Sequence, residues 1–328
     1  MNIQRLVRVG GKPILLMHGL IMSSECWLLN SRNESLAYLL YDAGFDVWLG
    51  NVRGNKYSRH HVGLSPDNKK FWEFSFDEMA EFDVPATIDF VLRTTEKAKL
   101  DYVGHSQGTV VLIAAAALNP NLNDKIGQFF ALAPAAYVPN MTSPLRYLQW
   151  LQVFLLNIQG EFGRDHPIFE RLSALACAFK TDLCESFFAI MGGYDATHTN
   201  ATRLPVYAAH DPSGTSIRNM VHWAQMLDAG KNVTIRYFDY GSDQSNMDKY
   251  NSTTPPYYNL ENFRVKTSVW CGGKDTFVEL KDCKKLADSM RNLSKLHVVE
   301  DYTHLSLIYA TNTPKVIANP IINMLGKK

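Results

Sequence analysis

The chain has 328 residues, enough for one large α/β core with an inserted subdomain or for two domains. Its hydrophobic fraction of 46% and aromatic fraction of 12% argue against a disordered protein. The 33 lysines and arginines nearly balance the 32 aspartates and glutamates, so the charge favours neither nucleic acid nor an acidic partner. No apolar stretch is long enough to predict a membrane-spanning helix.

The first part of the chain alternates between predicted strands and predicted helices. Short apolar runs that end at turn residues predict strands at residues 13–17, 45–49, 100–103 and 128–134. Apolar residues at helical spacing predict helices at residues 35–40, 76–93 and 109–118. This alternation is typical of a mostly parallel sheet covered by helices on both faces.

The pattern changes between residues 138 and 226, where prolines interrupt the chain and strand signals nearly vanish. We interpret this segment as a helical insertion. Its apolar stretch at residues 145–155 fits either packing onto the core or a lid over a greasy pocket. The earlier rhythm then returns, with strands expected at residues 233–237, 267–271 and 296–299 and a terminal helix at residues 314–325. The expected organisation is a core in two parts, residues 1–137 and 227–328, with a helical cap at residues 138–226.

Ser106 lies in a Gly-X-Ser-X-Gly motif, residues 104–108, directly between a predicted strand and a predicted helix. A serine on such a sharp turn takes a strained backbone conformation, and the flanking glycines let strand and helix approach closely. The turn presents the hydroxyl at the carboxyl end of the sheet, where helix N-terminal amides point. Because both flanking elements are present, we predict a nucleophile rather than a chance Gly-His-Ser turn.

A serine nucleophile needs a base, and ten histidines compete for that role. His304 lies just past the last predicted strand and before the terminal helix, where a base is expected in the chain order Ser, Asp or Glu, His. The competing histidines fall in a strand, in the insertion or in other loops: His297, His198, His210, His222, His18, His60 and His61. We therefore predict that His304 is the base.

Asp275 is the predicted acid, because it follows a strand and the flexible pair Gly272-Gly273 and precedes His304 by one helix and one strand. Its carboxylate would hold the imidazole tautomer and stabilise the imidazolium. Asp239 and Asp243 also follow a predicted strand and are rivals. The alternative for Asp275 is a helix cap or a turn aspartate.

Two backbone amides are expected to stabilise an oxyanion. One is the amide of Gln107, the residue after the nucleophile. The other is the amide of Leu20, in the loop that follows His18-Gly19, although this loop also fits a plain strand-ending turn.

The five cysteines are an odd set that predicts neither a disulfide framework nor a metal site. Cys177 and Cys184 are near neighbours that could pair or remain two buried thiols. Residues 1–5 open no signal peptide. Secretion is nevertheless favoured by six Asn-X-Ser/Thr sequons, which begin at Asn33, Asn140, Asn200, Asn232, Asn251 and Asn292. A chain that lacks its true start would reconcile these two observations.

These motifs together resemble the acid lipases, the gastric and lysosomal lipases of the α/β-hydrolase fold. The matching segments include residues 16–20, 48–55, 71–75, 104–109, 131–134, 213–216, 272–275 and 304–305. The Asn-X-Arg-Gly-Asn run at residues 51–55 is the specific one, because most α/β hydrolases lack it. The resemblance implies a triad of Ser106, Asp275 and His304, with oxyanion amides at Leu20 and Gln107.

The same resemblance implies a cap with a mobile lid after residue 134 and a disulfide between Cys177 and Cys184. It also implies hydrolysis of triacylglycerols or sterol esters at a lipid–water interface, without a cofactor or metal, by a secreted or lysosomal glycoprotein. Two alternatives stay open: an acyltransferase with the same acyl-enzyme, and a lipid carrier or impaired product of an incomplete chain. The chain departs from the family in lacking the leading segment and in having Ser306, where members usually have an acidic residue two positions after the histidine.

Overall fold

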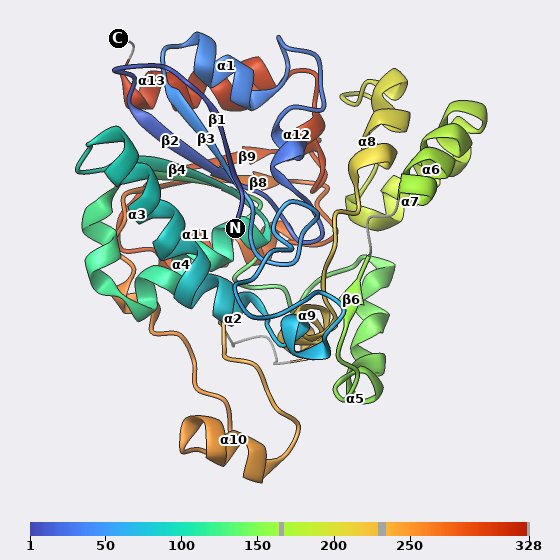
Figure 1. Cartoon of the computed structure of the whole chain (residues 1–328). Helices are drawn as coiled ribbons and strands as arrows, with labels where there is room; N and C mark the ends of the chain where they lie inside the picture. The colour runs from blue at the N-terminus through green and yellow to red at the C-terminus, as the bar shows by residue number, and fades with distance from the viewer. Residues whose placement is uncertain (164–166, 229–233, 327–328) are drawn as a thin grey trace.

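The computed structural model describes residues 1–163, 167–228 and 234–326, and its centre is a seven-stranded sheet (Figure 1). The strand order is β1-β3-β2-β4-β5-β8-β9. β1 runs antiparallel to β3, and the other neighbours in the sheet are parallel. The strands are β1 (Ile3–Leu6), β2 (Pro13–Met17), β3 (Asp46–Gly50), β4 (Leu100–His105), β5 (Ile126–Leu132), β8 (Thr267–Gly272) and β9 (Leu293–Val299). The predicted mostly parallel sheet is confirmed.

Helices cover both faces of this sheet, because its central strands are apolar on both sides. One face packs against α1 (Leu36–Asp42), α12 (Ser306–Tyr309) and α13 (Asn319–Leu325), and the other against α3 (Val84–Thr95), α4 (Gln107–Leu118) and α11 (Leu280–Ser289) (Figure 1). Successive residues of β2 point to opposite faces of the sheet. Ile14 and Leu16 pack in the hydrophobic core on the side of α1, α12 and α13. Leu15 and Met17 pack in the core on the side of α3, α4 and α11. The predicted layered α/β architecture is therefore confirmed.

The helix predicted at residues 76–93 is observed as three consecutive pieces, α2 (Phe76–Glu78), a π turn (Met79–Asp83) and α3. Ser75 and Glu78 cap its start reciprocally. The π turn ends two residues before Pro85, whose ring and missing N–H disturb regular helical hydrogen bonding. α4, by contrast, is buried on nearly all sides, which explains its apolar composition.

Between residue 138 and β8 the chain leaves the sheet and forms helices along one side of the core (Figure 1). These are α5 (Gln152–Leu155), α6 (Pro167–Phe179), α7 (Thr181–Gly192), α8 (Leu204–His210) and α9 (Ile217–Asp228). Two short strands, β6 (Glu161–Phe162) and β7 (Thr215–Ser216), pair antiparallel among them. Within the three described ranges, no helix is both long and apolar enough to cross a bilayer.

The strand predicted at residues 233–237 is wrong for the described residues 234–237, and Val233 lies outside them. Arg236 forms only an isolated bridge with Tyr257. This bridge closes the base of an excursion that carries α10 (Asp243–Tyr250) away from the core (Figure 1). The local β-branched pattern is therefore satisfied by a partner outside the main sheet. β1 was not predicted, because its sequence Ile-Gln-Arg-Leu mixes polar and apolar residues as edge strands do.

Asp77 links the start of α2 to the base of this excursion. Its Oδ1 accepts a hydrogen bond from the Tyr258 hydroxyl at 2.5 Å, and its Oδ2 accepts one from the Phe238 amide at 2.9 Å. Burial raises the pKa of Asp77 to about 7, although these two donors oppose the shift. Because the folded-state pKa is above the unfolded value, this carboxyl stabilises the fold most at acidic pH. The contribution is lost as pH rises toward 7.

We expect Asp77→Asn to flatten the pH dependence of stability, since the amide stays neutral at every pH tested. Relative to the variant, the wild type should lose at most about 4 kcal/mol of unfolding free energy between about pH 4 and pH 8. Urea unfolding at several pH values measures this difference. Asp248→Asn, on the exposed face of α10, is the matched control and should leave the slope unchanged. Parallel stability curves for Asp77→Asn and the wild type would contradict the prediction.

Candidate active site

Ser106 occupies a tight turn between β4 and α4, with φ 51° and ψ −118°. The two motif glycines permit this turn. A Cβ on Gly104 would lie 2.7 Å from the carbonyl oxygen of Gly108, and a Cβ on Gly108 would lie 2.3 Å from the carbonyl oxygen of Met17. No side chain fits at either position, so the spacing of the motif follows from the close approach of β2, β4 and α4. Such positive-φ strain in a serine is typical of a functional turn.

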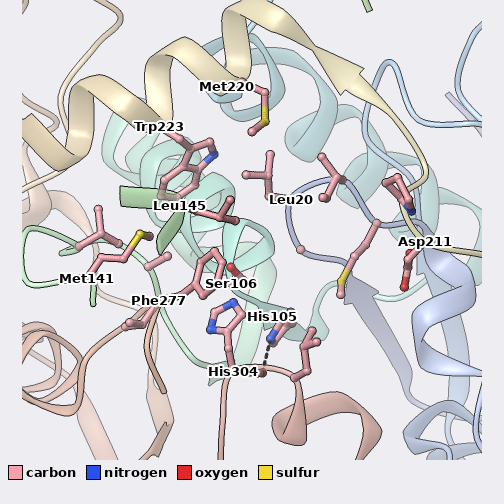
Figure 2. A pocket seen from close by; sticks show the side chains of 18 of the residues that line it. Leu20, His105, Ser106, Met141, Leu145, Asp211, Met220, Trp223, Phe277 and His304 are labelled. Carbon is pink, nitrogen blue, oxygen red and sulfur yellow. Dashed lines mark hydrogen bonds between the residues drawn. The ribbon is translucent and has the colours of Figure 1, made fainter. Parts of the chain in front are cut away.

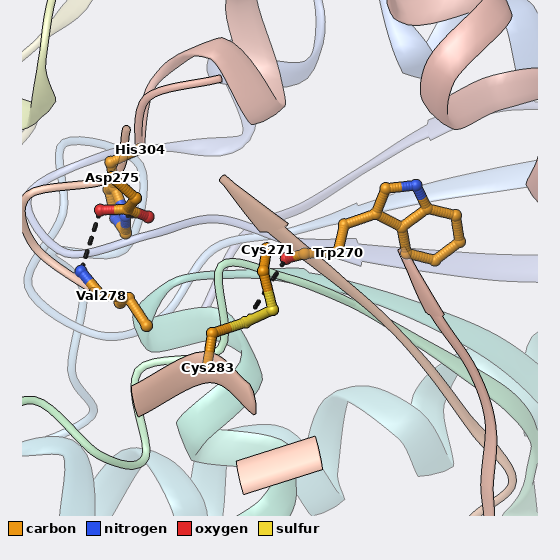
Figure 3. The surroundings of a disulfide bond; sticks show 6 residues. All are labelled: Trp270, Cys271, Asp275, Val278, Cys283 and His304. Carbon is orange, nitrogen blue, oxygen red and sulfur yellow. Dashed lines mark hydrogen bonds and ion pairs between the residues drawn. A yellow bond between two sulfur atoms is a disulfide. The ribbon is translucent and has the colours of Figure 1, made fainter. Parts of the chain in front are cut away.

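The structure brings His304 and Asp275 into direct contact. The Oδ2 atom of Asp275 lies 2.8 Å from Nδ1 of His304. Its Oδ1 atom accepts from the backbone amide of Phe277 at 2.8 Å. It also accepts from the backbone amide of Val278 at 2.9 Å (Figure 3). Both oxygens of this buried carboxylate are therefore engaged. Since Nδ1 donates to the carboxylate, Nε2 of His304 is the nitrogen left to accept a proton.

Ser106 and His304 line the same pocket, together with Leu20 (Figure 2). The rest of the lining is almost entirely apolar and comes from both the core and residues 138–226. It includes Met22, Val138, Met141, Leu145, Phe188, Met220, Trp223, Leu227 and Phe277. In Figure 2, Trp223 and Met220 of α9 lie above the pocket, and His304 lies below it. Such an apolar lining around Ser106 suits hydrocarbon chains.

The loop that carries Leu20 is held by a buried polar network around His18. Burial lowers the pKa of His18 to about 4, so the ring is neutral. Its Nδ1 donates to the carbonyl oxygen of Gly19 at 2.8 Å, and its Nε2 accepts from Asn55 Nδ2 at 3.2 Å and from the Val52 amide at 3.3 Å. The Asn-X-Arg-Gly-Asn segment thus shapes the loop beside Ser106. Sequence reasoning missed this role, because the contacts join residues more than thirty positions apart.

Gln107 follows Ser106 and is the first residue of α4, where backbone amides have no partner within the helix. Its side-chain Oε1 accepts from Trp223 Nε1 at 2.7 Å and from Asn219 Nδ2 at 2.9 Å. Both donors belong to α9. The helix over the pocket is therefore anchored to the residue whose backbone amide was predicted to stabilise an oxyanion.

The loop of His304 is also held by the helical segment. The Ser306 hydroxyl donates to Asp195 Oδ2 at 3.2 Å and accepts from the Thr303 amide at 3.1 Å. Asp195 lies just after α7 and is buried. An acidic group is therefore supplied to position 306 from a distant segment.

His105, the X of the motif, is a further residue that the sequence did not single out. It is buried, and desolvation holds the pKa of its imidazole well below the usual range. Its Nε2 lies 3.1 Å from the backbone oxygen of His304 and donates to it. Nδ1 is the nitrogen that faces Gly19, because a Cβ there would lie 2.9 Å from it. The His105 ring thus connects the turn that carries Ser106 to the loop that carries His304.

The competing candidates have other partners. Asp239 accepts from Asn246 Nδ2 at 3.0 Å in the α10 excursion, and Asp243 begins α10. His297 stacks on Trp270 with ring centroids 4.2 Å apart. His18, His198, His210 and His222 also have polar partners outside the pocket, which are Asn55, Asp195, Glu25 and Ser75 respectively. Neither these residues nor the exposed His60 and His61 line the pocket. Among described residues, no group of three or more His, Cys, Asp or Glu could hold a metal ion.

The structure contains two disulfides, where the odd cysteine count had predicted no framework. Cys177 and Cys184 are paired, as the family resemblance implied. Cys271 and Cys283 form a second pair, which the sequence analysis missed, and Cys26 is a buried free thiol. The odd count was misleading because it arises from two disulfide pairs and one free cysteine.

Comparison with known proteins gives consistent results. The profile of the alpha/beta hydrolase fold family matches residues 12–311. The chain is 40% identical to the gastric triacylglycerol lipase of Rattus norvegicus over 327 residues, which cover 97% of this chain and 82% of that protein. It is 39% identical to lipase member K of Homo sapiens over 324 residues, covering 97% and 80% of the two chains.

Solved structures share the fold at much lower identity. The Bacillus megaterium epoxide hydrolase has a TM-score of 0.56 at 13% identity, over 99% of this chain and 96% of that chain. The enol-lactonase of Burkholderia xenovorans LB400 has a TM-score of 0.54 at 15% identity, over 99% and 95% of the two chains. At such identities the likeness concerns the fold alone.

Proposed function

Because the chain belongs to the acid lipase family of α/β hydrolases and is a carboxylic-ester hydrolase, we propose that Ser106, His304 and Asp275 are its catalytic triad. The observation that carries this proposal is the 2.8 Å contact between His304 and Asp275, on an imidazole that lines the same pocket as the strained Ser106. The carboxylate fixes the tautomer in which Nε2 can take the serine proton.

The reaction proceeds in two halves. Ser106 Oγ attacks the ester carbonyl carbon as its proton passes to Nε2 of His304, and the backbone amides of Leu20 and Gln107 stabilise the oxyanion. Asp275 stabilises the imidazolium, which then gives the proton to the departing alcohol. Water next attacks the acyl-enzyme, with His304 taking and returning a proton, and a carboxylic acid is released. No metal or cofactor takes part in these steps.

The proposed substrates are triacylglycerols or sterol esters presented at a lipid–water interface. The apolar pocket supports this assignment, since it suits long acyl chains. We further propose that residues 138–226 form a cap over the core. Large apolar side chains exposed on this segment would meet a lipid surface: Tyr147, Trp150, Phe154, Phe179 and Phe187.

We also propose that the protein is a secreted or lysosomal glycoprotein. Disulfides persist mainly in oxidising compartments, and two are present. Three sequon asparagines, Asn33, Asn251 and Asn292, are exposed. Two sequon asparagines donate their side-chain amides within the protein, Asn140 to Asp282 at 2.6 Å and Asn292 to the carbonyl oxygen of Arg264 at 2.7 Å. Asn232 lies outside the described residues.

A fluorophosphonate probe tests the function directly. It should label the folded chain once, at Ser106, because only an activated serine beside a base attacks the phosphorus rapidly. Heat-unfolded protein is the control and should not react. The same preparation should hydrolyse a panel of acyl esters, with a competing alcohol added to detect acyl transfer. Folded protein that shows neither labelling nor turnover would overturn the proposal and favour a lipid carrier.

A further inference from the structure

The Cys271–Cys283 disulfide encloses the segment that carries the proposed catalytic acid. Cys271 is the second-to-last residue of strand β8, and Cys283 is in the first turn of α11, twelve positions later. Asp275 lies between them in the sequence, as do Phe277 and Val278 of the pocket lining. Figure 3 shows the sulfur bridge beside this loop. Both cysteines are fully buried, so the bond belongs to the interior of the molecule.

The backbone of this segment determines where the Asp275 carboxylate points. Its Oδ1 is fixed by the amides of Phe277 and Val278, and its Oδ2 by His304. If these two amides shift, the carboxylate rotates or moves with them. The position of residues 277 and 278 is therefore a condition for the contact with His304.

The segment is anchored at its start by the neighbouring turn. The Gly273 amide donates to the carbonyl oxygen of Val299 at 2.8 Å, and the Lys274 amide donates to that of Tyr302 at 2.9 Å. These bonds hold the residues before Asp275 against the stretch that leads to His304. They do not act on the residues after it.

The far end of the segment depends on the first turn of α11. The Cys283 amide donates to the carbonyl oxygen of Glu279 at 3.0 Å, so Cys283 is one helical turn from the residue that follows Val278. Hydrogen bonds from the cap segment also reach this region. The amides of Thr142 and Ser143 donate to the carbonyl oxygen of Thr276, the Thr142 hydroxyl donates to Glu279, and Asn140 donates to the Asp282 carboxylate. The disulfide is the covalent link between this far end and the sheet.

We propose that the Cys271–Cys283 disulfide positions Asp275 for catalysis, by fixing the first turn of α11 and hence the amides of residues 277 and 278 against the end of β8. The inference rests on the proposed function, because it assigns a role relative to the triad. The cysteines are positioning residues, and neither touches substrate.

The second disulfide of the same molecule provides a matched control. Cys177–Cys184 also closes a short loop, with a separation of 7 residues against 12, so both bonds should stabilise the chain similarly by restricting the unfolded state. It joins α6 to α7 and encloses no proposed catalytic residue. A purely structural role predicts the same consequences for the loss of either bond, whereas a positioning role predicts different ones.

The experiment compares Cys271→Ala/Cys283→Ala with Cys177→Ala/Cys184→Ala in the full chain, using a soluble nitrophenyl ester well below both melting temperatures. Both variants should melt earlier than the wild type. Only Cys271→Ala/Cys283→Ala should lose about 10- to 100-fold in kcat, with KM little changed, because a misplaced carboxylate supports the transition state poorly.

A folded Cys271→Ala/Cys283→Ala variant with wild-type kcat would overturn the inference, whatever its melting temperature. If this variant does not fold, wild-type protein is reduced in graded steps in sub-denaturing urea and alkylated. Loss of activity should then parallel alkylation of Cys271 and Cys283. A loss of activity that parallels only the alkylation of Cys177 and Cys184 would overturn the inference. A wild type without ester turnover would instead overturn the proposed function.

Discussion

Ser106→Ala is expected to lower kcat for a soluble nitrophenyl ester by about 10⁵- to 10⁶-fold, because the acyl-enzyme can no longer form. Residual turnover should remain above the rate in water, since the pocket and the backbone amides of Leu20 and Gln107 are intact. Stability should change little. Alanine keeps the Cβ that already fits the turn at φ 51°.

A matched control separates loss of the nucleophile from general damage. Ser268→Ala removes another buried serine hydroxyl, in β8 and outside the pocket, and should keep wild-type turnover. Both variants are compared by steady-state kinetics, fluorophosphonate labelling and thermal unfolding. Turnover of Ser106→Ala within tenfold of the wild type would rule out Ser106 as the nucleophile.

The three proposed catalytic residues could be selected from sequence because each follows a strand with a strong local signal. Ser106 comes directly after β4, Asp275 comes three residues after β8, and His304 comes five residues after β9. In a parallel sheet, the carboxyl ends of all strands lie at one edge, so loops far apart in the chain meet there. Three residues that each follow a parallel strand are therefore expected to lie close together at that edge, however far apart they are in the chain.

The supports of the site could not be selected in this way, because they depend on contacts between segments without a shared local pattern. Asp195 reaches Ser306 across 111 residues, and the Gln107 side chain reaches Trp223 across 116. Cys271 and Cys283 are close in sequence, yet their pairing depends on how α11 packs on β8. The strand predicted at residues 233–237, which is wrong for the described residues 234–237, has the same origin, since β propensity does not specify which partner a segment will find.

Asp275→Asn is expected to lower kcat by about 10⁴-fold while leaving KM within a few-fold of the wild type. The two backbone amides at residues 277 and 278 force this outcome, because they donate to Oδ1 and so require an oxygen there. The new NH₂ group must therefore face His304 Nδ1. The ring then accepts at Nδ1 and carries its proton on Nε2, where it cannot take the proton of Ser106.

Asp239→Asn is the matched control for this substitution, since Asp239 also follows the insertion and accepts hydrogen bonds, but in the α10 excursion away from the pocket. It should retain wild-type kcat. Steady-state kinetics and the rate of fluorophosphonate labelling should fall together in Asp275→Asn, because both need the same proton transfer from Ser106. A loss of less than tenfold, with Asp239→Asn impaired instead, would move the role of the acid to the other carboxylate. The 2.8 Å contact between His304 and Asp275 would then be a structural ion pair.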